Sequence, residues 1–134
     1  MRMRSERDSL GAKRVPGSAY YGIQTLRAVE NFPISGLRLP EEMVRAYALI
    51  KKAAAQANAA TGHLPRREAA AIQRACEEIL RGSLRDQFVV DVYQAGAGTS
   101  FNMNANEVIA NRANELLGAR KGSYRYVRPN DHVN

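Results

Sequence analysis

Apolar side chains recur at helical spacing in three stretches of the chain, and a glycine follows or closes each stretch. The first stretch covers residues 40–62 and begins with a proline and two acidic residues, which is typical of a helix start. Its predicted inward face consists of Met43, Ala46, Tyr47, Ile50, Ala53, Ala54 and Ala57. The other two stretches predict helices over residues 65–80 and 100–117.

Three further segments lack a sustained helical spacing of apolar residues. Residues 1–18 are polar and are predicted to form an irregular arm with a turn at Pro16-Gly17. Residues 20–33 are interrupted by glycine and proline, which predicts a short helical turn inside a loop. Residues 86–93 are β-branched and aromatic, so they are either a short strand or an extended lead into the next turn.

Together these elements predict an all-α fold class: a mainly helical single domain over residues 1–134, with an irregular N-terminal segment and at most a short strand pair. No apolar run approaches the roughly 20 residues that span a bilayer, and the N-terminus does not resemble a signal peptide. The single cysteine, Cys76, fits a reducing cytoplasm and is predicted to be a buried apolar residue. We therefore expect a cytoplasmic protein without a membrane partner.

The net charge of +7 comes from 20 basic and 13 acidic residues. The basic residues are scattered and no aromatic side chains alternate with them, so we expect no nucleic-acid partner. The same charge would attract a dicarboxylate or an acidic protein surface. No phosphate-binding loop, dinucleotide-binding turn or zinc-ligand spacing is present, and we expect no metal site.

The turn Gln94-Ala-Gly-Ala-Gly-Thr-Ser100 carries two hydroxyl groups to the start of the third predicted helix. Unpaired N–H groups and the positive end of the helix dipole make such a position suitable for a carboxylate or phosphate. The alternative is that Thr99 or Ser100 simply caps the helix.

Five asparagines follow within this helix, and such residues cost roughly 3 kcal/mol of helix propensity in total. They are Asn102, Asn104, Asn106, Asn111 and Asn114. Apolar residues surround much of the same helix, which predicts burial on several sides and a polar network along it.

Arginines elsewhere offer further candidates for binding an anion. Arg27 is suited to a planar carboxylate, although it could equally pair with Glu30. Arg125 and Arg128 lie with Asn130 and Asp131 around a proline, either as an anion site or as a solvated loop.

Three blocks of the sequence, in order, resemble the aspartase/fumarase superfamily. They are Ala19-Tyr-Tyr-Gly-Ile-Gln-Thr-Leu-Arg-Ala-Val-Glu-Asn-Phe-Pro-Ile-Ser-Gly36, Gly96-Ala-Gly-Thr-Ser-Phe-Asn-Met-Asn-Ala-Asn-Glu-Val-Ile-Ala-Asn111 and Pro129-Asn-Asp-His-Val-Asn134. The resemblance extends in register over residues 6–134. It implies the N-terminal domain of an aspartase-like fold.

The resemblance also implies a reaction: elimination across a Cα–Cβ bond of a succinyl-type substrate, with release of fumarate. A base removes the proton beside one carboxylate, and hydrogen-bond donors stabilise the aci-carboxylate that forms. By this resemblance Thr99 and Ser100 would bind a substrate carboxylate, Arg27 would influence substrate handling, and Asn104 and Asn106 would support the turn.

A secondary dicarboxylate site, described for fumarase-like members, would involve Arg125, Asn130 and Asp131. Arg128 departs from the histidine that fumarases carry at its position. The first block and Ala97-Gly-Thr-Ser100 are more similar to aspartate ammonia-lyases than to fumarases, which tend to carry tryptophan in the first block and glutamine after the threonine. Release of ammonia from L-aspartate is therefore the expected reaction, with fumarase as the alternative.

In this family the catalytic base is a serine on a glycine-serine loop far downstream, so no catalytic residue is expected within residues 1–134. We expect these residues to be an N-terminal domain that is inactive alone, and the complete protein to be a homotetramer that binds L-aspartate and fumarate. No cofactor is expected, and activation by a divalent cation is left open. The alternative from another class is a non-catalytic helical module that binds an anion or a partner chain.

Overall fold

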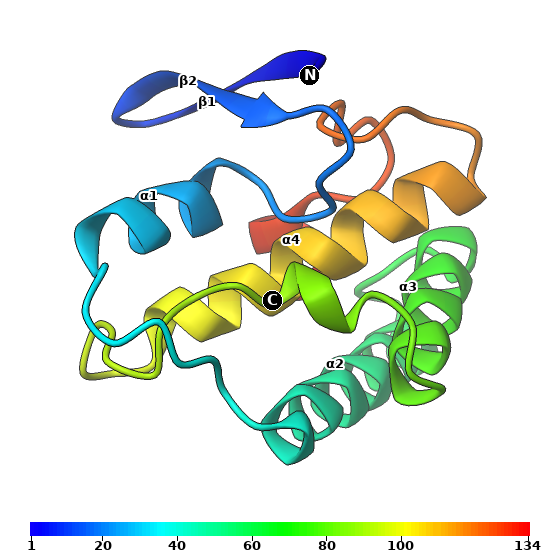
Figure 1. Ribbon diagram of the computed structural model, residues 1–134. Helices are drawn as coiled ribbons and strands as arrows, with labels where there is room; N and C mark the ends of the chain where they lie inside the picture. The colour runs from blue at the N-terminus through cyan, green and yellow to red at the C-terminus, as the bar shows by residue number, and fades with distance from the viewer.

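The computed structural model describes all residues from Met1 to Asn134. Its elements are β1 (Met3–Asp8), β2 (Gly11–Pro16), α1 (Ile23–Asn31), α2 (Glu41–Ala60), α3 (Arg66–Leu80), the 3-10 turn η1 (Arg85–Gln87), α4 (Thr99–Leu116) and the π-helical turn η2 (Pro129–Val133). Helix α4 crosses the middle of the molecule, with α2 and α3 below it and α1 and the hairpin above it (Figure 1). The mainly helical prediction is confirmed, and the three long helices begin and end within two residues of their predicted bounds.

The N-terminal segment forms an antiparallel hairpin, so the prediction of an irregular arm over residues 1–18 is wrong. Strands β1 and β2 pair from Met3 opposite Pro16 to Asp8 opposite Gly11. The Asp8 carboxylate accepts the Leu10 N–H at 2.9 Å inside the connecting turn, and Gly11 has a left-handed φ of 117°. The hairpin buries few of its side chains, which is why its strands show no apolar alternation in the sequence.

Residues 86–93 are mostly extended and do not form a strand. Their only ladder contact is one isolated antiparallel bridge between Arg38 and Asp91. The Asp91 carboxylate accepts N–H groups of Ser35, Gly36 and Tyr93 at 2.8–2.9 Å, and these bonds lower its pKa to about 2. Of the two alternatives, the extended lead into the glycine-rich turn is therefore confirmed.

The core lies between α2, α3 and α4 and contains 21 buried residues. Helix α3 buries Ile72, Cys76 and Ile79 fully in this core, which confirms the predicted burial of Cys76. The predicted face of α2 is wrong, because its buried residues are instead Val44, Ala48, Lys51 and Ala55. The buried face could not be recognised in the sequence, because it contains a lysine and because alanines occur on every side of the helix.

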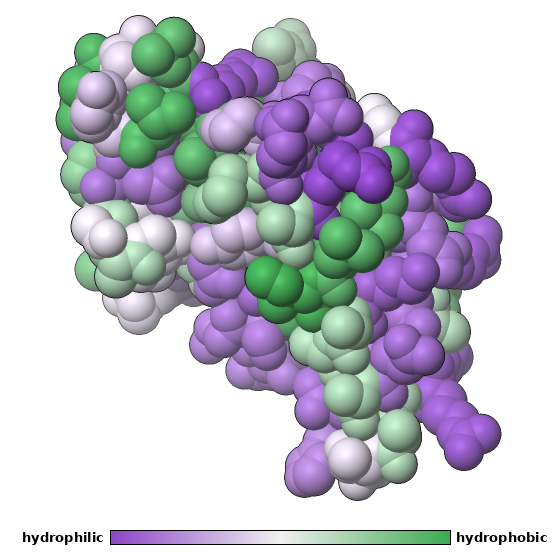
Figure 2. Space-filling model, turned by 90° about the horizontal axis from the view of Figure 1, so that it is seen from below, coloured by the Kyte–Doolittle hydropathy of each residue, from purple (hydrophilic) through white to green (hydrophobic).

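The residues predicted to be buried on α2 lie largely on the surface. Met43 and Ile50 are 38% and 59% exposed. Seen from below, the molecule shows a strip of apolar surface between hydrophilic regions (Figure 2). No helix of the protein is both long enough and apolar enough to cross a membrane.

Candidate functional site

The glycine-rich turn leaves the first residues of α4 open to solvent. Gly98 is the N-cap residue, with a left-handed φ of 77°, and it has no side chain to cap the helix. The alternative in which Thr99 or Ser100 is an N-cap is therefore wrong. The Phe101 N–H is bonded to Gln94 Oε1 at 2.8 Å, whereas the N–H groups of Thr99 and Ser100 have no acceptor in the protein.

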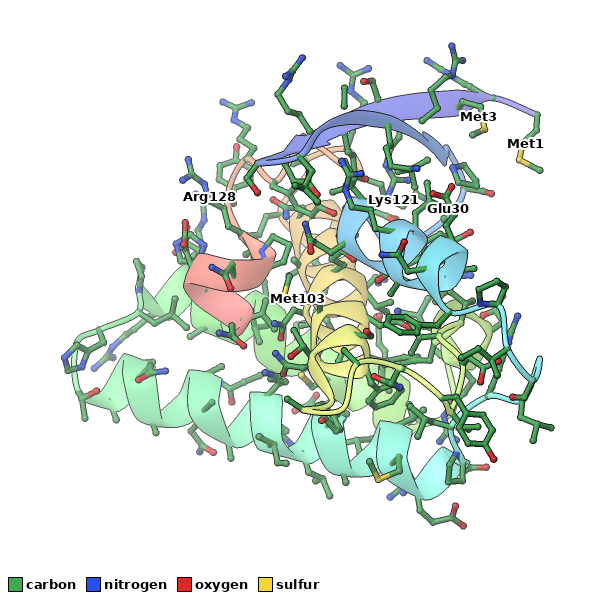
Figure 3. All side chains as sticks on the ribbon, turned by 90° about the vertical axis from the view of Figure 1, so that its left-hand side faces the viewer. Met1, Met3, Glu30, Met103, Lys121 and Arg128 are labelled. Atoms are coloured by element: carbon green, nitrogen blue, oxygen red, sulfur yellow. The ribbon has the colours of Figure 1, made fainter.

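Thr99 forms part of the wall of a pocket of about 590 Å³. The pocket lies between the end of β1, the start of α1, one side of α4 and the start of η2. Thr99, Met103 and Glu107 follow one another at four-residue spacing and form its α4 side. Figure 3 shows Met103 on α4 beside η2, with Arg128 where the chain enters η2. The remaining lining residues are Arg7, Asp8, Ile23, Gln24, Tyr124, Arg128, Pro129, Asn130 and Asp131.

Positive charge in this pocket is only partly neutralised. Arg7 has no ion-pair partner, and Arg128 is 3.5 Å from Asp131 in a largely exposed pair that contributes little. Asp8 is already bound by Arg27, with Nε and Nη2 each 2.8 Å from a carboxylate oxygen. That pairing lowers the pKa of Asp8.

Two buried carboxylates bind the N-terminus of α1, and one of them, Glu107, lines the pocket. Glu107 accepts the N–H groups of Gln24 and Thr25 at 3.0 and 2.8 Å, and Glu6 accepts that of Ile23 at 3.1 Å. Burial raises the pKa of Glu107 to about 7, against the effect of these hydrogen bonds. The Tyr124 hydroxyl donates to Glu6 at 3.0 Å, and burial raises its pKa as well.

The sequence-predicted site residues fall into two groups. Thr99, Asn130 and Asp131 line the same pocket, although they are about 30 residues apart in the chain. Ser100, Arg27 and Arg125 do not line it.

Each of the three has another environment. Ser100 is half-buried. Arg27 binds Asp8 and the Gly11 carbonyl oxygen rather than Glu30, which pairs with Lys13. Arg125 is exposed with its guanidinium 5.2 Å from the centre of the Tyr126 ring, so Arg128 rather than Arg125 accompanies Asn130 and Asp131.

Two asparagines of α4 hold neighbouring segments against this helix. The Asn104 amide donates to the Gln87 carbonyl oxygen and accepts the Val89 N–H, both at 2.9 Å. It therefore fixes the extended segment that leads into the glycine-rich turn. Asn106 is fully buried and donates to the Asn134 side-chain oxygen at 3.2 Å.

Sequence reasoning missed Arg7, Glu107 and Tyr124 as pocket residues. Glu107 offered a signal, because a glutamate between Asn106 and the apolar pair Val108 and Ile109 on a buried helix needs a partner. Arg7 offered none, since its place depends on the hairpin. In sum, the pocket presents a helix N-terminus, a free hydroxyl and two arginines, which is an arrangement suited to a carboxylate ligand.

The chain is similar to known lyases. Residues 11–134 match the family model described as Lyase. The aspartate ammonia-lyase of Pseudomonas aeruginosa is 56% identical over 133 residues, and the class II fumarate hydratase of Halobacterium salinarum is 58% identical over 131. Each alignment covers 98% of this chain and 28% of the relative.

A solved structure superimposes closely on this chain. The crystal structure titled fumarate lyase:delta crystallin from Brucella melitensis, in native form, has a TM-score of 0.97 and 57% sequence identity. The superposition covers 99% of this chain and 31% of the chain in that structure. The chain thus spans less than a third of the length of the proteins that it matches.

Proposed function

Because the chain belongs to the lyase family of the aspartase and fumarase superfamily, we propose that the complete protein is an aspartate ammonia-lyase, which releases ammonia from L-aspartate to give fumarate. Residues 1–134 contribute one wall of its active site. The observation that supports this proposal most strongly is the open N-terminus of α4, where Thr99 carries a hydroxyl without a partner beside two unbonded N–H groups.

These donors suit the charge that develops in an elimination. Removal of the proton beside a carboxylate gives an aci-carboxylate with negative charge on two oxygens. Donors that already point to that position stabilise it without reorganisation. In our proposal the Thr99 hydroxyl and the α4 N–H groups bind a carboxylate of L-aspartate, and Arg7 and Arg128 provide a positive field at the pocket entrance.

The proposal assigns supporting roles to other residues. Asn104 fixes the approach of the glycine-rich turn through Gln87 and Val89. Asn130 and Asp131 form the opposite side of the pocket and would contact a second polar group of a ligand. The base that removes the proton lies outside these 134 residues, and no cofactor takes part. The complete protein is a cytoplasmic homotetramer in this proposal.

The decisive experiment replaces Thr99 in the complete protein. Thr99→Ala removes the hydroxyl from an exposed position, so we expect kcat/KM for L-aspartate to fall by about 10²- to 10³-fold with thermal stability unchanged. Thr99→Ser keeps the hydroxyl and should retain most of the activity. The measurement is fumarate formation followed by ultraviolet absorbance. Unchanged turnover in T99A would assign Thr99 to the wall without a role in binding.

Fumarase is the second candidate, because the class II fumarate hydratase of Halobacterium salinarum is as similar to this chain as the ammonia-lyases are. The two activities differ in the group that adds to fumarate. Incubation of the complete protein with fumarate and ammonium should yield aspartate, and incubation with fumarate alone should yield no malate. Malate formation without ammonium would overturn the ammonia-lyase proposal in favour of fumarase.

A further inference from the structure

Helix α2 carries a buried lysine with no acidic partner. Lys51 is 7% exposed and lies in the buried row of α2 with Ala48 and Ala55. Its only hydrogen bond runs from Nζ to Asn102 Oδ1 on α4, at 2.8 Å, and it takes part in no ion pair. The neighbouring Lys52 instead pairs with Glu77 at 3.4 Å on the surface. A buried ammonium is costly, so its position needs an explanation.

The ammonium sets the direction of a chain of amide hydrogen bonds. An ammonium can only donate, so Asn102 must turn its Oδ1 toward Lys51 and its Nδ2 away. Asn102 Nδ2 then donates to Asn134 Oδ1 at 2.9 Å, and Asn106 Nδ2 donates to the same oxygen at 3.2 Å. Asn106 Oδ1 is left buried with no partner.

In the opposite arrangement the Asn134 NH₂ group would donate to Asn106 Oδ1, and the Asn106 NH₂ group would take the position without a partner. That arrangement requires Asn102 to present its oxygen to Asn134 and its NH₂ group to Lys51. Two donors would then face each other at Lys51. The ammonium of Lys51 therefore determines the orientation of all three asparagines. We call the set Lys51, Asn102, Asn134 and Asn106 the amide relay.

The amide relay attaches η2 to α4 next to the Thr99 pocket. Asn134 directly follows η2, and its N–H is bonded to the Pro129 carbonyl oxygen at 3.1 Å. The other end of η2 provides Asn130 and Asp131 to the pocket, and α4 provides Thr99. The position of η2 on α4 therefore fixes the distance between the two sides of the pocket.

We propose that Lys51 is a positioning residue for the Thr99 pocket, acting through the amide relay that holds η2 against α4. The effect on catalysis rests on the proposed function, whereas the effect on η2 does not. Lys51 lies behind α4 and does not line the pocket, so it acts only through Asn102 and η2.

The test uses the complete protein and four variants. Lys51→Met removes the ammonium and keeps the apolar stem, and Lys52→Met is its matched control on the same helix. Asn134→Ala removes the shared acceptor, and Asn134→Asp keeps an acceptor for both amides. Hydrogen–deuterium exchange by mass spectrometry reports on the amides of residues 132–134, which are bonded within η2. Steady-state kinetics with L-aspartate give KM and kcat.

We expect amides 132–134 to exchange about tenfold faster in K51M and N134A, and at the wild-type rate in K52M and N134D. KM for L-aspartate should rise about tenfold in K51M with kcat changed less than about threefold, because the misplaced wall weakens binding. If K51M fails to fold, N134A and N134D test the relay by the exchange rate of amides 132–134. Faster exchange in N134A than in N134D supports the relay, and equal rates overturn it.

Wild-type exchange of η2 in K51M and N134A would overturn the relay, and so would equal acceleration in K52M. If the wild-type complete protein has no lyase activity but K51M and N134A still exchange faster, the relay is kept and the proposed function is refuted. If the wild type is an active lyase but K51M and N134A show unchanged exchange and unchanged KM, the relay alone is refuted.

Discussion

Glu107 lies two turns after Thr99 on the pocket side of α4, and this residue is only 1% exposed. Its two oxygens bind three donors at the start of α1, namely two N–H groups and the Thr25 hydroxyl. The hydrogen bonds favour the ionised form, whereas burial and the nearby Glu6 favour the protonated form. Burial has the larger effect on the pKa, so the protonation of Glu107 affects the stability of the fold.

The pKa of Glu107 makes stability depend on pH. The unfolded chain releases this proton near pH 4.5 and the folded chain near pH 7, so the folded state binds more protons between these values. Its stabilising effect is complete below pH 4.5 and is lost as pH rises through 7, by about 3 kcal/mol for this shift. Urea unfolding at several pH values should show this decline in the wild type and not in Glu107→Gln. An equal decline in both proteins would contradict the assignment.

Helix α1 depends on residues from distant elements because its own sequence provides no cap. Its N-cap is Gly22, which offers no side-chain hydrogen bond, and its first turn contains no acidic residue. The carboxylates of Glu6 and Glu107 supply the missing acceptors from β1 and α4. Only a glycine allows this approach, since a Cβ at position 22 would lie 2.3 Å from both Glu107 Oε2 and the Tyr124 hydroxyl.

Gly22→Ala should therefore destabilise the protein by about 1–3 kcal/mol, the usual cost of an added group in a packed site. The matched control is Gly96→Ala, because a Cβ at Gly96 meets nothing within 4 Å. Thermal unfolding should show a clear decrease in Tm for G22A and almost none for G96A. Equal values of Tm in the two variants would mean that the start of α1 moves to accept the methyl group.

At the scale of the whole molecule, the hairpin and the helices are held by different interactions. The helices share the core of 21 buried residues, whereas the hairpin and the start of α1 bury only Val15, Ala19 and Ile23 in a separate cluster. Polar contacts supply much of the remaining attachment. Arg4 donates to the carbonyl oxygens of Pro16, Ala19 and Tyr21 at 2.7–3.0 Å, and Arg27 binds Asp8.

The hairpin should therefore open before the helical core. In hydrogen exchange, the amides of β1 and β2 should exchange faster than those of α4, and Asp8→Asn should accelerate them several-fold further because it weakens the two-bond contact with Arg27. Arg14→Gln is the matched control, since Arg14 is exposed on β2. Equal effects of D8N and R14Q would show that the ion pair does not hold the hairpin.

The sequence alone determined the three long helices, because caps, glycines and apolar spacing are local signals. It also determined the open turn before Thr99 and the requirement for partners along the asparagine-rich helix α4. These features follow from neighbours in the chain, so no knowledge of the fold was needed. The three matching blocks were likewise sufficient to indicate the family that the comparisons show.

Only the tertiary structure decided which distant groups meet. The buried face of α2 depends on what packs against it, and Lys51 looks like a surface residue until Asn102 is placed beside it. The separation of Arg125 from Asn130, the pairing of Arg27 with Asp8 and the entry of Arg7 into the pocket all depend on the path of the chain between helices. Local spacing carries no information on such contacts, because they join segments that are far apart in sequence and are fixed only when the core packs.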